Sequence, residues 1–322
     1  MKAAPVRSAR ARGSVLAAML LAVALLPGWA MAHRDNSACA GAAALPNHCR
    51  VPNSGSYVPD AAHAEADHAG NGQADGCWTT GDFTQFRSCT LGRPQAKYTV
   101  ALVGNSHAGQ YLNPLRTWAD QYDMRIVAYL IPKCFAIDEK IDIGDKHYGP
   151  VMNDRCRAWG QWVQRQTNAL KPDLIVTTER TYKKPIPVRS GGQWQTWKAG
   201  YQRYLKGWTS QGQHLLVVRD NPVPGKSVPA CLAAHPHKFS KCAGDRAKWL
   251  PPDALVAAAE SLHTSLISAV DLSDYMCTDT TCPGVLGGLC VYRDHSHMTA
   301  TWVRSLQAYL EEPFAAALHH HP

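Results

Sequence analysis

Residues 98–109, YTVALVGNSHAG, decide the fold of this chain. The first six are apolar, aromatic or β-branched, which predicts a buried strand that ends at Gly104. Beyond it, apolar residues recur at the spacing of one helix face: Ala108, Tyr111, Leu112, Leu115 and Trp118. A buried strand that turns sharply into a helix is the repeating unit of parallel sheets, so the stretch predicts an α/β fold.

The same alternation continues along the chain. Further strands are expected at 124–131, 173–178, 214–219 and 269–272, and further helices at 156–170, 193–208, 254–267 and 299–310. This order predicts a mostly parallel sheet with helices on both faces, a three-layer α/β/α sandwich. Ligands of such sheets bind beyond the carboxyl ends of the strands, which is where residues 104–107 are expected.

Ser106 follows the first predicted strand directly and would begin a helix. Free N–H groups and the helix dipole favour negative charge at this position. A serine there can attack a carbonyl carbon while its own N–H helps to hold the oxyanion. The competing interpretation is that Ser106 only caps the helix, which is a common role for serine.

A second polar motif, DHSH at residues 294–297, lies just before the last predicted helix. A carboxylate three residues before an imidazole can hold Nδ1 of His297 while Nε2 faces a serine hydroxyl. Asp294 and His297 are therefore candidates for the orienting acid and the general base. His295 competes for the base role at a poorer spacing, and a polar loop without chemistry is the alternative.

The first 32 residues have the features of a secretory signal peptide. Basic residues precede an apolar run at 15–26, Pro27 and Gly28 end it, and small residues stand at positions 30 and 32. The run is short for a membrane span, although a retained anchor is the alternative. Residues 1–32 hold four basic and no acidic side chains, so their removal lowers the formal charge from +8 to +4. This mild charge without a basic cluster argues against nucleic acid as a partner.

The chain contains eleven cysteines, and in an exported protein they predict a disulfide framework. Pairing sequence neighbours suggests five bridges: Cys39–Cys49, Cys77–Cys89, Cys134–Cys156, Cys231–Cys242 and Cys277–Cys282. Cys290 is left over and is expected to be a buried thiol in a strand. The sequence has no Cys-x-x-Cys pair, which argues against metal binding by these residues.

Composition divides the chain into four expected parts. They are the signal peptide at 1–32, a loop-like Cys-rich extension at 33–95, the α/β domain at 96–315 and a tail at 316–322. Hydrophobic residues make up 45% of the chain and charged residues 18%. This balance allows a sizeable core and argues against disorder.

The two polar motifs together resemble those of SGNH/GDSL hydrolases, and more closely those of the extracytoplasmic SGNH domain fused to membrane acyltransferases of the acyltransferase-3 family. The matching segments are residues 39–45, Cys49, Cys77, 89–92, 103–108, 220–222, Cys277, Cys282 and 292–299. The resemblance implies a flavodoxin-like sheet of the SGNH hydrolase type. It also implies Ser106 as nucleophile, His297 as general base and Asp294 as the group that orients the base.

Some positions depart from the family's pattern. The family usually has Asp where Asn105 stands. Broader SGNH enzymes add a Gly and an Asn as oxyanion donors after later strands, and neither is evident here. Gly104, Asn105 and Arg180 are the candidate oxyanion or substrate residues, with a salt bridge as the alternative role of Arg180. Losing one oxyanion donor costs about 10²–10³ in rate, so a weak enzyme is one expected outcome.

The resemblance implies an exported esterase or O-acyltransferase, periplasmic or secreted, that acts on acyl groups of envelope or extracellular polysaccharide. It implies no cofactor and no metal, and it points to a membrane acyltransferase as a partner, since the sequence shows no fused membrane domain. A degenerate module that binds polysaccharide without turnover is the second hypothesis. A metal-dependent hydrolase built on Asp294, His295 and His297 is the third.

Overall fold

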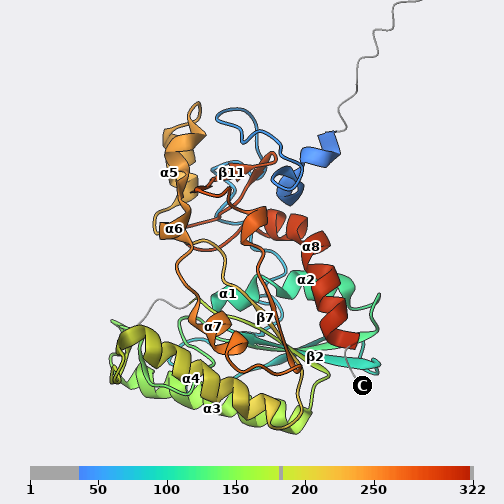
Figure 1. Ribbon diagram of the computed structural model, residues 1–322, viewed down its shortest axis with the longest axis vertical. Helices are drawn as coiled ribbons and strands as arrows, with labels where there is room; N and C mark the ends of the chain where they lie inside the picture. The colour runs from blue at the N-terminus through green and yellow to red at the C-terminus, as the bar shows by residue number, and fades with distance from the viewer. Residues whose placement is uncertain (1–35, 181–183, 320–322) are drawn as a thin grey trace, which may run out of the picture. The chain divides into compact units, whose positions relative to one another are not determined.

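The computed structural model describes residues 36–180 and 184–319, and the predicted signal peptide lies outside them. Their centre is a six-stranded sheet in the order β1-β3-β2-β5-β7-β9 (Figure 1). Its strands are β1 Cys89–Gly92, β2 Tyr98–Gly104, β3 Met124–Leu130, β5 Leu174–Thr178, β7 Leu215–Val218 and β9 Ile267–Val270. Neighbouring strands pair in parallel except β1, which runs antiparallel to β3 at one edge.

The order of the parallel strands places the predicted serine turn at a topological switch point. β2 is central, β3 adds on one side of it, and β5, β7 and β9 add in succession on the other. This is the flavodoxin-like order, so the predicted fold class is confirmed. Gly104, at the carboxyl end of β2, pairs with Leu130 of β3 and Thr178 of β5. A binding crevice is expected where the direction of winding reverses.

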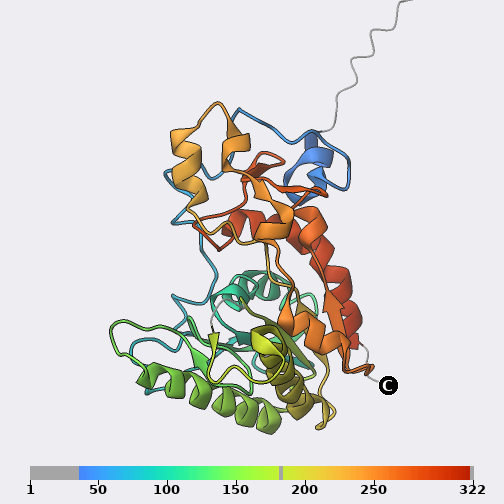
Figure 2. The ribbon, with the colours of Figure 1, turned by 60° about the vertical axis from the view of Figure 1, so that its left-hand side comes forward.

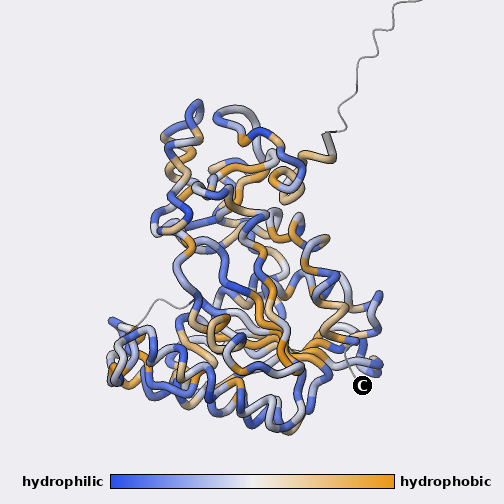
Figure 3. Tube along the Cα trace, viewed as in Figure 1, coloured by the Kyte–Doolittle hydropathy of each residue, from blue (hydrophilic) through white to orange (hydrophobic). Residues whose placement is uncertain are grey.

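Helices cover both faces of the sheet (Figures 1 and 2). One face carries α3 Val151–Leu170, α4 Gly192–Thr209 and α7 Ala254–Glu260, and the other carries α2 Leu112–Trp118 and α8 Ala300–His319. The sheet has a hydrophobic core on each face, and alternate side chains of β2 belong to one or the other. Val100 and Leu102 join the cluster of α2 and α8, whereas Ala101 and Val103 join that of α3 and α4. Both faces are buried, which explains the continuous hydrophobic run of β2 and its neighbours in Figure 3.

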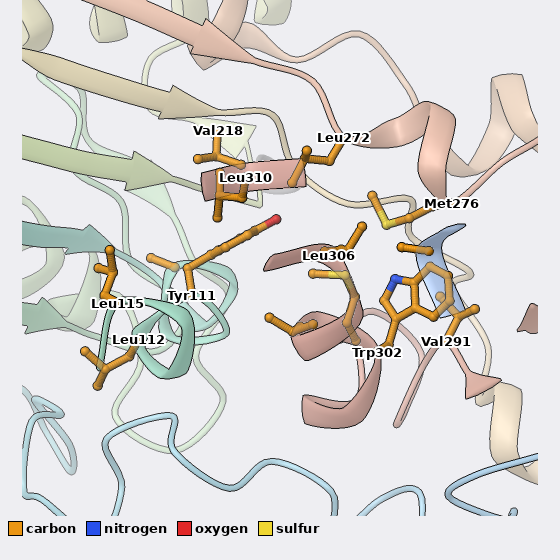
Figure 4. Close-up of a cluster of buried hydrophobic side chains, with 14 of the residues drawn as sticks. Tyr111, Leu112, Leu115, Val218, Leu272, Met276, Val291, Trp302, Leu306 and Leu310 are labelled. Carbon is orange, nitrogen blue, oxygen red and sulfur yellow. The ribbon is translucent and has the colours of Figure 1, made fainter. Parts of the chain in front are cut away.

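The core on the α2 and α8 face extends well past the sheet (Figure 4). Leu112 and Leu115 of α2 lie on one side of this cluster, and Leu306 and Leu310 of α8 lie near its centre. Trp118 stacks on Phe314 with ring centroids 5.1 Å apart. Phe314, Ala317 and Leu318 are also buried, and α8 continues to His319, past Pro313 and into the predicted tail at 316–322.

Two other predicted helices differ from those observed. The helix expected after Gly104 is split into α1 Ser106–Gly109 and α2. Pro114 has no N–H for the carbonyl four residues earlier, which explains why one continuous helix does not form there. The helix expected at 254–267 ends at Glu260, because Ile267 pairs with Leu215 and begins β9.

The expected extension at 33–95 contributes a strand to the main sheet. β1 lies within it and pairs with β3 through four residues, Cys89–Gly92. The five disulfides join the same pairs that sequence neighbours suggest. Cys290 is a buried free thiol in strand β12, and its Sγ donates to the carbonyl of Tyr292 at 3.3 Å.

The other helices and strands of the described residues are short. They are η1 Asn36–Cys39, η2 Gly41–Ala44, β4 Ile141–Asp142, β6 Lys184–Pro185, α5 Val228–Ala234, η3 Phe239–Cys242, β8 Gly244–Asp245, α6 Arg246–Trp249, η4 Ser273–Tyr275, β10 Thr281–Cys282, β11 Val285–Leu286 and β12 Leu289–Cys290. Among the residues described, no helix combines the length and the apolar character that a membrane crossing requires.

Candidate active site

The turn that carries Ser106 requires glycine at its first position. Gly104 has φ +146°, and a Cβ atom there would lie 2.5 Å from the carbonyl oxygen of Thr178 and 2.8 Å from Cβ of Ala108. The backbone of β2 can therefore approach β5 closely and still turn into α1. As a result, Ser106 is partly exposed as the first residue of α1, at the switch point of the sheet.

Asn105 is almost fully buried and joins this turn to the end of β5. Its Oδ1 accepts hydrogen bonds from the backbone N–H groups of His107 (3.1 Å) and Arg180 (3.3 Å). Its Nδ2 donates to the carbonyl of Arg180 at 3.4 Å. An ionised aspartate could not make that last bond. The neutral residue therefore suits this junction, although the family usually has Asp there.

Asp294 and His297 form the local pair that their spacing predicts. Nδ1 of His297 lies 2.7 Å from Oδ2 of Asp294. Oδ1 of Asp294 accepts from the backbone N–H groups of Ser296 (2.7 Å) and His297 (2.8 Å). A proton on Nδ1 satisfies this carboxylate and leaves Nε2 as a lone-pair acceptor.

The surroundings of this pair favour a neutral imidazole beside an ionised carboxylate. Burial lowers the pKa of His297, and the nearby His107 lowers it further, against the raising effect of Asp294. Burial acts to raise the pKa of Asp294, but the hydrogen bond and charge of His297 outweigh it and hold that pKa well below its usual range. A neutral imidazole at pH 7 is the form that can accept a proton.

Ser106 and His297 line one pocket of about 320 Å³, which also contacts Trp78, Gln110 and Arg293 and is called the Ser106 pocket below. Nε2 of His297 is buried and has no hydrogen-bond partner among the described residues, so it makes no such bond to Ser106 Oγ. Catalytic hydrogen bonds are often long before substrate binds. The structure thus brings Ser106 and His297 to one pocket, and Asp294 lies just outside its lining with its bond to His297 formed.

A second histidine–carboxylate pair lies behind the first, and sequence reasoning missed it. Nδ1 of His107 is 2.5 Å from Oδ1 of Asp220, and the rings of His107 and His297 lie 4.9 Å apart. The backbone N–H of Asp220 donates to Asp253, whose pKa burial raises to about 6. His107 and Asp220 are 113 positions apart, so their spacing in the sequence could not predict the contact.

Gln110 and Asn221 hold the backbone on both sides of His297, and they were also missed as functional residues. Oε1 of Gln110 accepts from the N–H of Met298 at 2.5 Å, and Nδ2 of Asn221 donates to the carbonyl of Ser296 at 2.9 Å. The two side chains are joined by a bond of 3.1 Å from Gln110 Nε2 to Asn221 Oδ1. The loop with the imidazole is therefore attached to the residue that caps the C-terminus of α1 and to the segment after β7.

Arg180 lines a different pocket from Ser106. That second pocket, of about 160 Å³, also contacts Arg219, Asp220 and Asp253. The neighbouring Glu179 is buried, accepts from the N–H of Ala136 at 2.6 Å, and has a pKa that burial raises well above its usual value. The backbone of Arg180 is bonded to the side chain of Asn105, the residue before Ser106.

His295 does not share the position of His297. Its Nδ1 lies 3.9 Å from Oδ1 of Asp294, and its side chain is mostly exposed. Among the described residues, no cluster of three or more His, Cys, Asp or Glu side chains is arranged to hold a metal ion.

Residues 75–312 match the family model described as "SGNH domain (fused to AT3 domains)". Among solved structures, the periplasmic domain of a lipopolysaccharide acetyltransferase from Salmonella ser. Paratyphi A is similar, with a TM-score of 0.55 and 10% identity over 80% of this chain and 98% of that one. A Bacteroides fragilis protein with a provisional assignment as an acylhydrolase has a TM-score of 0.42 and 11% identity, over 71% of this chain and 92% of its own. No curated protein matches the chain.

Proposed function

This chain belongs to the family of SGNH domains that occur fused to AT3 domains, and we propose that it cleaves or transfers acyl esters through an acyl-serine intermediate. One observation carries the proposal: Ser106 at the switch point of the sheet shares a pocket with His297, whose imidazole is held by Asp294. A nucleophile, a base and an orienting acid are the parts that such chemistry needs.

The proposed reaction has two halves. Nε2 of His297 takes the hydroxyl proton while Ser106 Oγ bonds to the acyl carbon, and the backbone N–H of Ser106 stabilises the oxyanion. The imidazolium then gives its proton to the departing alcohol oxygen, which leaves an acyl-serine. Water or a second hydroxyl attacks this ester as His297 again accepts the proton. Its transfer to Oγ releases the acid or new ester and restores Ser106.

We further propose an exported enzyme that acts on O-acylated carbohydrate, with acetyl as the expected acyl group. Five disulfides suit an oxidising compartment. The family's fusion to AT3 domains makes a membrane acyltransferase the candidate partner. The related Salmonella domain belongs to a lipopolysaccharide acetyltransferase, which motivates the carbohydrate class.

A fluorophosphonate probe tests the nucleophile. The wild-type protein should be labelled, Ser106→Ala should not, and Ser240→Ala, which changes an exposed serine in η3, should be labelled normally. Equal labelling of wild type and Ser106→Ala would reject the assignment.

Turnover separates the enzyme from a binding module that lacks activity. Wild type should release acetate from 4-nitrophenyl acetate or from an acetylated oligosaccharide. The end of β5 and the residues after it, Thr178-Glu179-Arg180, supply neither the Gly nor the Asn oxyanion donor of other SGNH enzymes. This observation favours the second candidate. Glycan binding without any turnover would support the binding module instead.

A further inference from the structure

The acidic and basic side chains that line the Ser106 pocket are all basic. Two arginines, Arg87 and Arg293, line it, and none of the described residues that line it is an aspartate or a glutamate. One acid lies just outside, since Asp294 is 3.9 Å from Nη2 of Arg293 and already bonded to His297. Arg87 is exposed and belongs to the segment between the two cysteines of one disulfide. The pocket therefore offers guanidinium groups to a ligand without an acid in its lining.

An aromatic side chain beside these charges is held in a fixed position. Nε1 of Trp78 donates to the carbonyl of Asn71 at 2.9 Å. Its ring lies directly on α1, because a Cβ atom at Gly109 would be only 2.4 Å from Trp78 Cζ2. Trp78 remains partly exposed and lines the Ser106 pocket. A fixed, partly exposed indole next to the helix of Ser106 provides a flat apolar surface on which a sugar ring can stack.

The segment that supplies Trp78 and Arg87 is attached to the domain at several points. The Cys77–Cys89 disulfide closes it, and its second cysteine is the first residue of β1. Just before it, Asp75 pairs with Arg116 of α2 at 2.6 Å. The backbone N–H of Thr79 donates to the carbonyl of Leu130 at the end of β3. This wall of the pocket is thus preorganised, which lowers the cost of binding.

We infer that the glycan substrate is acidic: a sugar stacks on Trp78 while a carboxylate or phosphate on the same or the adjacent residue binds Arg87 and Arg293. Arginine pairs with both kinds of anion in the same forked geometry. The inference rests on the proposed function, because it names the substrate of that same site.

Binding to Ser106→Ala tests the inference without turnover. The probes are an acetylated oligogalacturonide, its methyl ester, which removes only the charge, and an acetylated oligomannoside phosphate. Calorimetry should show the acid bound at least about tenfold more tightly than its methyl ester, since bonds to charged groups are the stronger ones. Comparison with the phosphate tells which anion the site prefers.

Arg87→Gln should remove about tenfold to hundredfold of the affinity for the preferred anion and leave binding of the methyl ester unchanged. Arg165→Gln, at an exposed position of α3, is the matched control and should change neither. Equal affinity for acid and ester, or no binding of any probe, overturns the inference.

Turnover of 4-nitrophenyl acetate reports on the proposed function separately, because that ester needs neither arginine. Wild type and the control Arg165→Gln should hydrolyse it equally. Activity on this ester without any preference for acidic sugars would sink the inference and leave the proposed function standing.

Discussion

Two histidine–carboxylate pairs lie with their rings 4.9 Å apart, and they differ in exposure and in origin. Asp294 and His297 are three positions apart, and His297 is 17% exposed and lines the Ser106 pocket. His107 and Asp220 come from two strand ends, and His107 is 1% exposed and does not line that pocket. Each imidazole is bonded to its carboxylate through Nδ1. The same chemical unit can thus meet a ligand in one place and only support a neighbour in the other.

The difference teaches that a bonded His–Asp pair is not by itself an active site. Access decides which imidazole can exchange a proton with substrate, because a base must come within hydrogen-bond reach of the proton that it takes. We therefore expect the pair in the pocket to control the rate, and the buried pair to control the position and the pKa of the first.

The largest expected effect is that of His297→Ala. Loss of the base should lower kcat on 4-nitrophenyl acetate by about 10⁴–10⁶-fold, as loss of a triad base does in serine hydrolases. His295→Ala is the matched control, since that exposed imidazole also lies beside Asp294 and should change kcat less than about threefold. Equal losses in the two variants would contradict the assignment of the base.

Asp294→Asn should lower kcat by about 10⁴-fold, because an amide no longer stabilises the Nδ1–H tautomer or the imidazolium. Steady-state kinetics measures this effect. A loss smaller than tenfold would show that the hydrogen bond of 2.7 Å has no part in turnover.

Asp220→Asn should lower kcat less than Asp294→Asn does. Removing the charged acceptor of a buried imidazole should destabilise the fold by about 1–3 kcal/mol, measured by urea unfolding. A small displacement of the rings should lower kcat by about tenfold to hundredfold. A fall in kcat as large as in Asp294→Asn would show that the two pairs have the same role, and it would contradict the distinction between an exposed catalytic pair and a buried supporting pair.

The smallest expected effect is on pH dependence. Neutral His297 is the active base, so kcat/KM should fall as pH drops through its pKa, which burial and His107 hold below the usual 6.5. His107→Asn keeps a donor for Asp220 but removes the neighbouring ring, which should raise the pKa of His297 and move the acid limb to higher pH by less than one unit. An unmoved limb in a pH–rate profile would show that the rings do not interact.

Local pattern predicted much of the fold and part of the site. The apolar runs of β2, β3, β5 and β7, the helical spacing of α3 and α4, and the flavodoxin-like class all agree with the structure. The contact of Asp294 with His297 could also be predicted from the sequence, because the two residues are only three positions apart. Pro114 also marked the break between α1 and α2, but the apolar spacing across it hid this signal.

Other contacts could not be predicted from local sequence patterns. β1 has the composition of a loop and becomes a strand only because the edge of β3 is available to pair with it. The wall of the Ser106 pocket that includes Trp78 and Arg87 comes from the same segment, which was expected to be an extension outside the domain. Its role follows from where it packs.

The sequence by itself determined most strands and helices of the main sheet, the fold class, and the serine turn and Asp-x-x-His loop as separate motifs. These depend on side-chain periodicity and on backbone geometry over a few residues. Only the tertiary structure placed His107 against Asp220 and Gln110 against Met298, across 113 and 188 positions. Such contacts depend on the order in which strands add to the sheet, and that order brings together chain segments whose separation in sequence carries no information about their distance in space.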